Sequence, residues 1–171
     1  MQNVIKTYLS SEQIHGRVRE LAARISADYQ DRDLCLIAVL NGALMFTADL
    51  VRLLPLRMEL DFIKISSYQG TTTTGNPKCL HGPGLDLTDK DILVVDDILD
   101  TGLTLTKILD MLKDHNPRSL RTCVLLDKPD RRQVDLQADY AGFTIDDLFV
   151  VGYGLDYNEQ YRNLPYIGIL T

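Results

Sequence analysis

The sequence predicts a single α/β domain with a mostly parallel central sheet flanked by helices. Two continuous apolar runs, LCLIAVL (34–40) and DILVVDD (91–97), have the pattern of strands buried on both faces. Each run is followed by a segment with helical spacing, ALMFTADLVRLL (43–54) and LTLTKILDMLKDH (103–115). Strands that alternate with helices are typical of a parallel sheet, and a length of 171 residues (1–171) fits one domain with its own core.

The other elements follow from local patterns. Ser10 and Gln13 have the spacing of a capping box and start a first helix, and Pro55 ends the second. The apolar pattern of residues 56–65 changes parity, which predicts a long strand with a bulge or an extended hairpin arm. Three more strands are expected, at 120–127, 148–154 and 166–170.

The segment SSYQGTTTTGNPKCLHGPG (66–84) contains four threonines, four glycines and two prolines. It has no helical or strand periodicity. Because a long irregular segment in a compact domain is usually functional or disordered, two interpretations are open, and we favour a mobile lid loop over a disordered one.

The net charge of the chain argues against two classes of binding partner. Eighteen basic and twenty-four acidic residues give a net charge of −6, which disfavours broad binding to nucleic acid or to an anionic membrane. The N-terminus lacks the apolar core of a signal peptide, and no run reaches the ~18 apolar residues of a membrane span. We therefore expect a cytoplasmic protein, with Cys35, Cys79 and Cys123 as free thiols.

The stretch ILVVDDILDTGLTL (92–105) places Asp96, Asp97 and Asp100 directly after a buried strand. Carboxylates in low-dielectric surroundings need cations, polar ligands or water to stay ionised, so this cluster predicts a site. An acidic pair can accept hydrogen bonds from a sugar diol or bind a divalent metal.

The segment DTGLT (100–104) leads into the third helix. Its backbone N–H groups can converge on an anion, Thr101 and Thr104 add hydroxyl donors, and Gly102 permits a close approach. The chain contains neither a Walker A loop nor a G-x-G-x-x-G motif, which argues against ATPase and dinucleotide-binding functions. A phosphate site beside an acidic pair predicts a ribose phosphate ligand.

In open α/β sheets, ligands bind beyond the carboxyl ends of the strands. Four predicted strand ends carry polar or flexible residues: Asn41–Gly42, Asp96–Asp97, Asp127–Lys128 and Tyr153 to Asp156. We expect these ends to meet in one crevice.

Taken together, these motifs identify a resemblance. ILVVDDILDTGLTL resembles the phosphoribosyl pyrophosphate motif of type I phosphoribosyltransferases. SYQGTTTTG, LLDKPDRR and LFVVGYGLDYNEQYRNLPYIG resemble the hypoxanthine-guanine branch, and the similarity spans nearly the whole chain. The resemblance implies the type I fold, with a small hood built from the N- and C-terminal segments. It also implies Mg²⁺-dependent transfer of ribose 5-phosphate from phosphoribosyl pyrophosphate to a 6-oxopurine, in purine salvage.

The resemblance implies roles around the sugar and the leaving group. Asp96 and Asp97 hold the ribose hydroxyls, directly or through a metal, and Asp100 is the general base near purine N7. The phosphoribosyl pyrophosphate site is completed by Asn41, Gly42, Thr101, Gly102, Leu103, Thr104 and Arg162. Leu103 stands where other members have polar or basic residues. Asn41 lacks the charge of the lysine found in some members, and the family predicts a cis peptide in this turn.

The resemblance also implies how the purine is bound. Lys128 donates to the 6-oxo group, so adenine, which has a 6-amino donor, should be a poor substrate. Phe149 stacks on the purine, the backbone of Val150 binds the base edge, and Asp156 is a Mg²⁺ ligand. Ser67 and Tyr68 are the lid pair that excludes water from the reacting centre. Relatives form dimers or tetramers, which implies a homo-oligomer.

Three other functions share some of these sequence features. A receiver domain of a signalling pathway carries a similar acidic strand end, but the motif begins near residue 92 and leaves too little chain for the rest of that fold. An RNA-binding regulator with the same fold would need a basic face, and the only basic cluster is Arg131–Arg132. A xanthine-preferring enzyme is the third alternative. The preference among hypoxanthine, guanine and xanthine depends on the geometry of the base site, which the sequence does not give.

Overall fold

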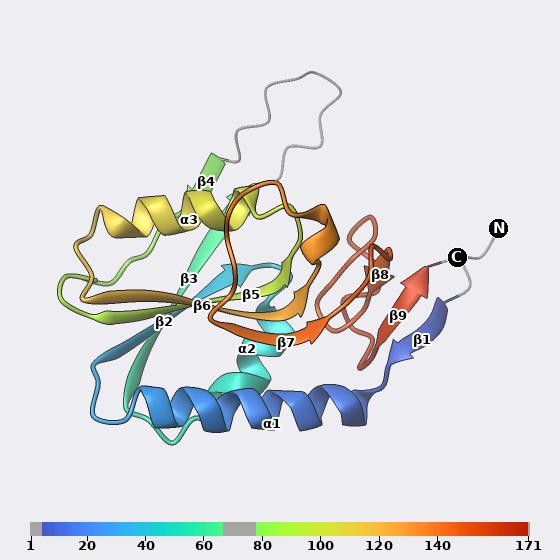
Figure 1. The fold of residues 1–171 in the computed structure, drawn as a ribbon, viewed down its shortest axis with the longest axis horizontal. Helices are drawn as coiled ribbons and strands as arrows, with labels where there is room; N and C mark the ends of the chain where they lie inside the picture. The colour runs from blue at the N-terminus through green and yellow to red at the C-terminus, as the bar shows by residue number, and fades with distance from the viewer. Residues whose placement is uncertain (1–4, 67–77, 171) are drawn as a thin grey trace.

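The computed structural model describes residues 5–66 and 78–170 (Figure 1). The helices are α1 (Ser11–Asp28), α2 (Leu44–Val51), α3 (Leu103–Lys113) and the 3-10 turn η1 (Pro129–Arg131). The strands are β1 (Ile5–Leu9), β2 (Leu34–Leu40), β3 (Met58–Ser66), β4 (Lys78–His81), β5 (Asp91–Leu99), β6 (Ser119–Asp127), β7 (Tyr140–Thr144), β8 (Val150–Val151) and β9 (Ile167–Leu170).

The main sheet has six strands in the order β4-β3-β2-β5-β6-β7. Strands β3, β2, β5, β6 and β7 run parallel, and β4 pairs antiparallel with β3 at the edge. Helices α1 and α2 lie on one face and α3 on the other (Figure 1). The prediction of a mostly parallel sheet flanked by helices is confirmed.

The continuous apolar runs are explained by burial on both faces. Alternate residues of β2 belong to two different cores, one beneath α1 and α2 and the other beneath α3. The first core takes Leu34, Leu36 and Ala38, and the second takes Cys35, Ile37 and Val39. Because both faces are covered, neither set of side chains can be polar.

The predicted capping box starts α1. The Ser10 hydroxyl accepts from the Gln13 backbone N–H at 3.3 Å, and the Gln13 side chain accepts from the Ser10 N–H at 2.8 Å. Two N–H groups that the helix cannot pair internally are thus satisfied. This fixes where α1 begins and sets its apolar stripe against the sheet.

The range 66–84, expected to be irregular, contains a strand. Residues 78–81 form β4, which pairs with β3 as a hairpin arm whose register shifts between Lys64 and Ile65. The sequence predicted either a long strand with a bulge or an extended hairpin arm, and the structure has both features, since β3 forms a hairpin with β4 and its register shifts. Ser67 and Tyr68 lie outside the described residues.

The chain ends form a small second sheet, in the order β1-β9-β8, which we call the hood (Figure 1). The predicted strand 148–154 is shorter than expected, because β8 stops at Val151. Gly152, Tyr153 and Gly154 all have positive φ (98°, 52° and 103°), which turns the chain out of the sheet. Within the described residues, no helix is long and apolar enough to cross a bilayer.

Candidate functional site

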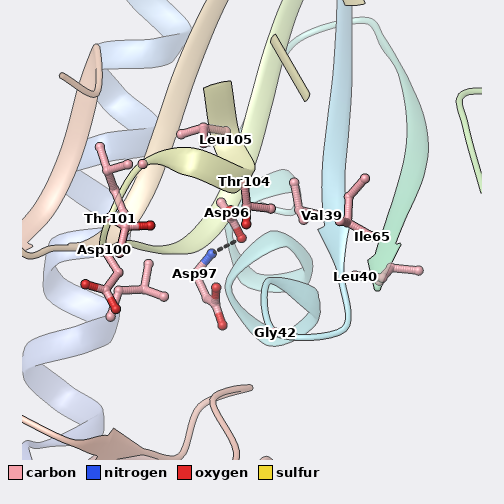
Figure 2. A pocket seen from close by; sticks show the side chains of 13 residues that line it. Val39, Leu40, Gly42, Ile65, Asp96, Asp97, Asp100, Thr101, Thr104 and Leu105 are labelled. Carbon is pink, nitrogen blue, oxygen red and sulfur yellow. Dashed lines mark hydrogen bonds between the residues drawn. The ribbon is translucent and has the colours of Figure 1, made fainter. Parts of the chain in front are cut away.

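A cavity of about 340 Å³ lies beyond the carboxyl ends of β2 and β5 (Figure 2). Its lining comes from Val39, Leu40 and Gly42, from Ile65, and from residues 96–102, 104 and 105; the predicted contacts Asn41 and Leu103 do not line it. Gly42, Asp96, Asp97, Asp100, Thr101, Gly102 and Thr104, all predicted to bind phosphoribosyl pyrophosphate, line this one cavity. It thus occupies the crevice in which the rule for open α/β sheets places ligands.

Asp96 and Asp97 are the charged end of β5. Asp96 is 8% exposed, and its Oδ1 accepts from the Asp97 backbone N–H at 2.9 Å (Figure 2). Burial raises the pKa of Asp96, and the neighbouring charge of Asp97 raises it further. Burial also raises the pKa of Asp97, while hydrogen bonds from Asp96 and from the backbone, and to a smaller extent the charge of Arg162, oppose that shift. Such a pair is suited to a ligand that brings positive charge or hydroxyl donors.

The N-terminus of α3 forms the adjoining wall. Gly102 is its N-cap residue, with φ 84°, and a Cβ there would lie 2.6 Å from Val134 Cγ2. The Leu103 N–H lies 3.4 Å from the Thr101 hydroxyl, and the Leu103 side chain is 45% exposed. Since a helix N-terminus presents free N–H groups and a positive dipole end, this wall can bind an anion.

Three loops close on one another at the second wall. A Cβ on Gly42 would overlap the Asp97 carboxylate, and a Cβ on Gly154 would overlap the Gly42 carbonyl. The peptide bond before Asn41 is cis. Three of the four predicted strand ends therefore meet, and they meet so closely that glycine is required at both positions.

A second cavity, of about 540 Å³, adjoins this wall. Asn41, Gly154 and Arg162 line it. Arg162 Nη2 lies 2.8 Å from Asp156 Oδ1, and its Nη1 donates to the Gly154 carbonyl at 2.8 Å. The predicted metal ligand Asp156 is thus paired with the predicted pyrophosphate contact. In the described part of the chain, no group of three or more His, Cys, Asp or Glu side chains is placed to hold a metal.

The predicted purine contacts follow β6 and surround β8. Lys128 is 6% exposed, and its Nζ donates to the Leu148 carbonyl at 2.6 Å. Phe149 is 54% exposed and packs edge-to-face on Tyr157, with ring centroids 5.7 Å apart. Val150 is buried in β8. An exposed aromatic ring held by a second ring is a suitable surface for stacking.

Arg131 and Tyr157 were missed by the sequence analysis. Arg131 Nε lies 3.1 Å from Asp100 Oδ1, although Arg131 had been read only as part of a basic cluster. Arg132 donates to the backbone carbonyls of Asp100 (3.0 Å) and Leu99 (3.3 Å). No spacing in the sequence signals these contacts, since they join different loops.

Comparison with known proteins identifies the family. The phosphoribosyl transferase domain model matches residues 4–158. A hypoxanthine-guanine phosphoribosyltransferase of Staphylococcus epidermidis is 46% identical over 171 residues, covering 99% of this chain and 94% of the relative. One of Bacillus subtilis is 43% identical over 169 residues, covering 98% and 94%. A crystal structure of a hypoxanthine-guanine phosphoribosyltransferase from Bacillus anthracis superposes with a TM-score of 0.92 at 44% identity, covering 99% of this chain and 100% of that one. The chain therefore belongs to the phosphoribosyltransferase family.

Proposed function

We propose that the protein is a purine salvage enzyme that transfers the 5-phosphoribosyl group of phosphoribosyl pyrophosphate to hypoxanthine or guanine. The products are IMP or GMP and pyrophosphate. The observation that carries the proposal is the buried pair Asp96–Asp97 beside the N-terminus of α3, in one cavity. Carboxylates for a ribose diol and N–H donors for a phosphate are the two halves of a ribose phosphate site.

The two walls of the cavity bind different parts of phosphoribosyl pyrophosphate. The N-terminus of α3, with Thr101 and Thr104, binds the 5-phosphate, and Asp96 and Asp97 accept from the ribose hydroxyls. On the other side, the backbone of Asn41–Gly42 and the guanidinium of Arg162 bind the pyrophosphate, which leaves with the C1–O bond electrons. Arg162 is already held at the Gly154 carbonyl, so its orientation is set before the ligand arrives.

The donor set fits Mg²⁺ bound together with substrate. Mg²⁺ is commonly held by one or two carboxylates, substrate phosphates and water rather than by an all-protein cage. Asp156, Asp96 and Asp97 are the residues that would hold it, since carboxylate oxygens are the ligands that Mg²⁺ prefers. When bound, the metal neutralises charge on the leaving pyrophosphate.

Asp100 acts as the general base. As purine N9 bonds to C1 of the ribose, the N7 proton passes to the Asp100 carboxylate. Lys128 donates to the 6-oxo group, Phe149 stacks on the ring, and the backbone of Val150 pairs with the base edge. A 6-amino group would face the Lys128 ammonium with another donor, which disfavours adenine.

Ser67 and Tyr68 are proposed to close over the reacting centre, and the protein is proposed to act as a homo-oligomer in the cytoplasm. Both proposals rest on the family alone.

The test is a nucleotide-formation assay with phosphoribosyl pyrophosphate and Mg²⁺, run in parallel on hypoxanthine, guanine, xanthine and adenine. Asp100→Ala should lower kcat by about 10²–10⁴-fold, the usual contribution of a general base. Asp110→Ala is the matched control, since Asp110 is exposed on α3 and pairs with Lys113 at 2.9 Å. Faster turnover of xanthine than of hypoxanthine and guanine would favour the xanthine-preferring alternative. No turnover of any base would overturn the enzyme proposal and move the RNA-binding alternative to first place.

A further inference from the structure

The guanidinium of Arg131 lies against the side chain of Asp100, with Nε 3.1 Å from Oδ1. That oxygen is buried, and within the described residues it has no hydrogen bond of good geometry. The ion pair with Arg131 therefore offsets the cost of burying the charge on Asp100 Oδ1. With Oδ1 engaged, the second oxygen of the same carboxylate remains to receive a substrate proton.

Arg131 is held by the short turn that follows β6. The turn η1 begins at Pro129, directly after Lys128, and the Arg131 N–H donates back to the Lys128 carbonyl at 3.3 Å. Its neighbour Arg132 donates to the backbone carbonyl of Asp100 at 3.0 Å. Consecutive arginines thus fix the backbone and the carboxylate of the same aspartate.

Asp147 links this pair to Lys128. Arg131 Nη1 donates to Asp147 Oδ1 at 3.4 Å, and Lys128 Nζ lies 3.8 Å from the same oxygen. The four side chains alternate in sign from Asp100 through Arg131 and Asp147 to Lys128. Each charged group therefore has a neighbour of opposite charge. The row connects Asp100, the proposed base, to Lys128, the proposed contact of the purine 6-oxo group.

We infer that Arg131 is a positioning residue that acts through Asp100, and that Asp147 is the counter-charge that keeps Arg131 in place. The inference rests on the proposed function, in which Asp100 receives the N7 proton. A reacting group displaced by about 1 Å can lower a rate by about 10²-fold, so an ion pair that fixes one carboxylate oxygen has a measurable effect. A surface ion pair without this role would change turnover little.

A double-mutant cycle tests the inference, with kcat and the KM for hypoxanthine measured at saturating phosphoribosyl pyrophosphate. Arg131→Gln should lower kcat about 10–100-fold and change KM by less than about threefold. Because Arg131 acts through Asp100, adding Arg131→Gln to Asp100→Asn should lower kcat no further. Arg131→Lys should recover part of the loss, since it keeps the charge but lacks Nε. Lys113→Gln, which removes an exposed ion pair of α3, should leave kcat unchanged.

Two results would overturn the inference and leave the proposed function intact: an unchanged kcat in Arg131→Gln, or effects that multiply in the double variant. Asp147→Asn is the second variant, for use if Arg131→Gln does not fold. It should lower kcat in the same direction by a smaller factor, and an unchanged kcat would count against the inference. Wild-type protein that turns over no base would overturn the proposed function and this inference with it.

Discussion

At the scale of single residues, the charged side chains of the proposed site are buried or partly buried and held in place by specific partners. Lysine is rarely buried unless it is paired, yet Lys128 is 6% exposed. Its ammonium has a backbone carbonyl, that of Leu148, and a carboxylate, that of Asp147, as partners. Of these two partners, only the Leu148 carbonyl is within hydrogen-bond distance, so the buried ammonium keeps N–H donors that a ligand acceptor can use.

Lys128→Gln should lower kcat/KM for hypoxanthine by about 10²-fold, because the charged donor that we propose for the 6-oxo group is lost. It should lower kcat/KM for adenine much less, since glutamine can also accept a hydrogen bond. The measurement is the ratio of the two kcat/KM values, with the thermal midpoint as a check on folding. A ratio equal to that of the wild type would show that Lys128 does not discriminate between these bases.

Gly42→Ala should raise the KM for phosphoribosyl pyrophosphate by at least about tenfold, because the new Cβ would overlap the Asp97 carboxylate and displace it. Gly16→Ala is the matched control. A Cβ on Gly16 meets nothing within 4 Å, and Gly16 lies in α1, where alanine stabilises a helix by about 1 kcal/mol relative to glycine. Steady-state kinetics should show an unchanged KM in Gly16→Ala, and urea unfolding should show that this control is at least as stable as the wild type. A normal KM in Gly42→Ala would contradict the packing described for this turn.

At the scale of elements, β5 carries both the core and the site. Its residues 91–96 are buried, and its last part, toward the cavity, carries the pair Asp96–Asp97, two residues before the strand ends at Leu99. Burial raises the pKa of Asp96. The folded protein therefore binds a proton on Asp96 at pH values where the unfolded chain has lost it. The free energy of unfolding must then fall as pH rises from the ordinary aspartate value, 3.8, to the raised one.

Asp96→Asn should remove this fall and make the ligand-free protein more stable at neutral pH. Each titrating proton contributes at most about 1.4 kcal/mol per pH unit, so the difference between variant and wild type should grow with pH within the window and stay constant above it. Asparagine can still accept from the Asp97 N–H, which preserves the local hydrogen bond. Urea unfolding between pH 4 and 8, without ligand, measures the difference. A constant difference over that range would contradict the raised pKa.

The sequence predicted those elements whose pattern lies within one contiguous stretch of residues. The run 34–40 became β2 with the same bounds, because burial on both faces leaves an unbroken apolar pattern. β7 was missed, since YAGFT is an edge strand of mixed burial without such a run. The acidic pair and the N-terminus of α3 were found because they are contiguous in the chain. The contact between Arg131 and Asp100 was not, because it depends on how two separate loops turn.

At the scale of the whole molecule, the site exists only when distant parts of the chain are folded together. The first cavity is lined by the ends of β2 and β5 of the main sheet and by the segment that leads into α3. Gly154 and Arg162, which line the second cavity, come from the segment between β8 and β9 of the hood. The Tyr153 hydroxyl also donates to Asp49 Oδ2 at 2.7 Å, which ties that segment to α2. Ligand binding and folding of this segment are therefore expected to be linked.

Phosphoribosyl pyrophosphate with Mg²⁺ should consequently raise the thermal midpoint, because the unfolded chain lacks the site. At a ligand concentration of about 100 times Kd, the stabilisation is about 2.7 kcal/mol, which corresponds to about 5–10 °C for a chain of this size. Gly42→Ala should lose about half of this shift or more, since a tenfold weaker affinity leaves about 1.4 kcal/mol, while Gly16→Ala should keep it. Thermal unfolding with and without ligand makes the comparison. An equal shift in both variants would mean that the ligand binds away from the contact of Gly42, Asp97 and Gly154, and that the cavity beyond β2 and β5 is not the phosphoribosyl pyrophosphate site.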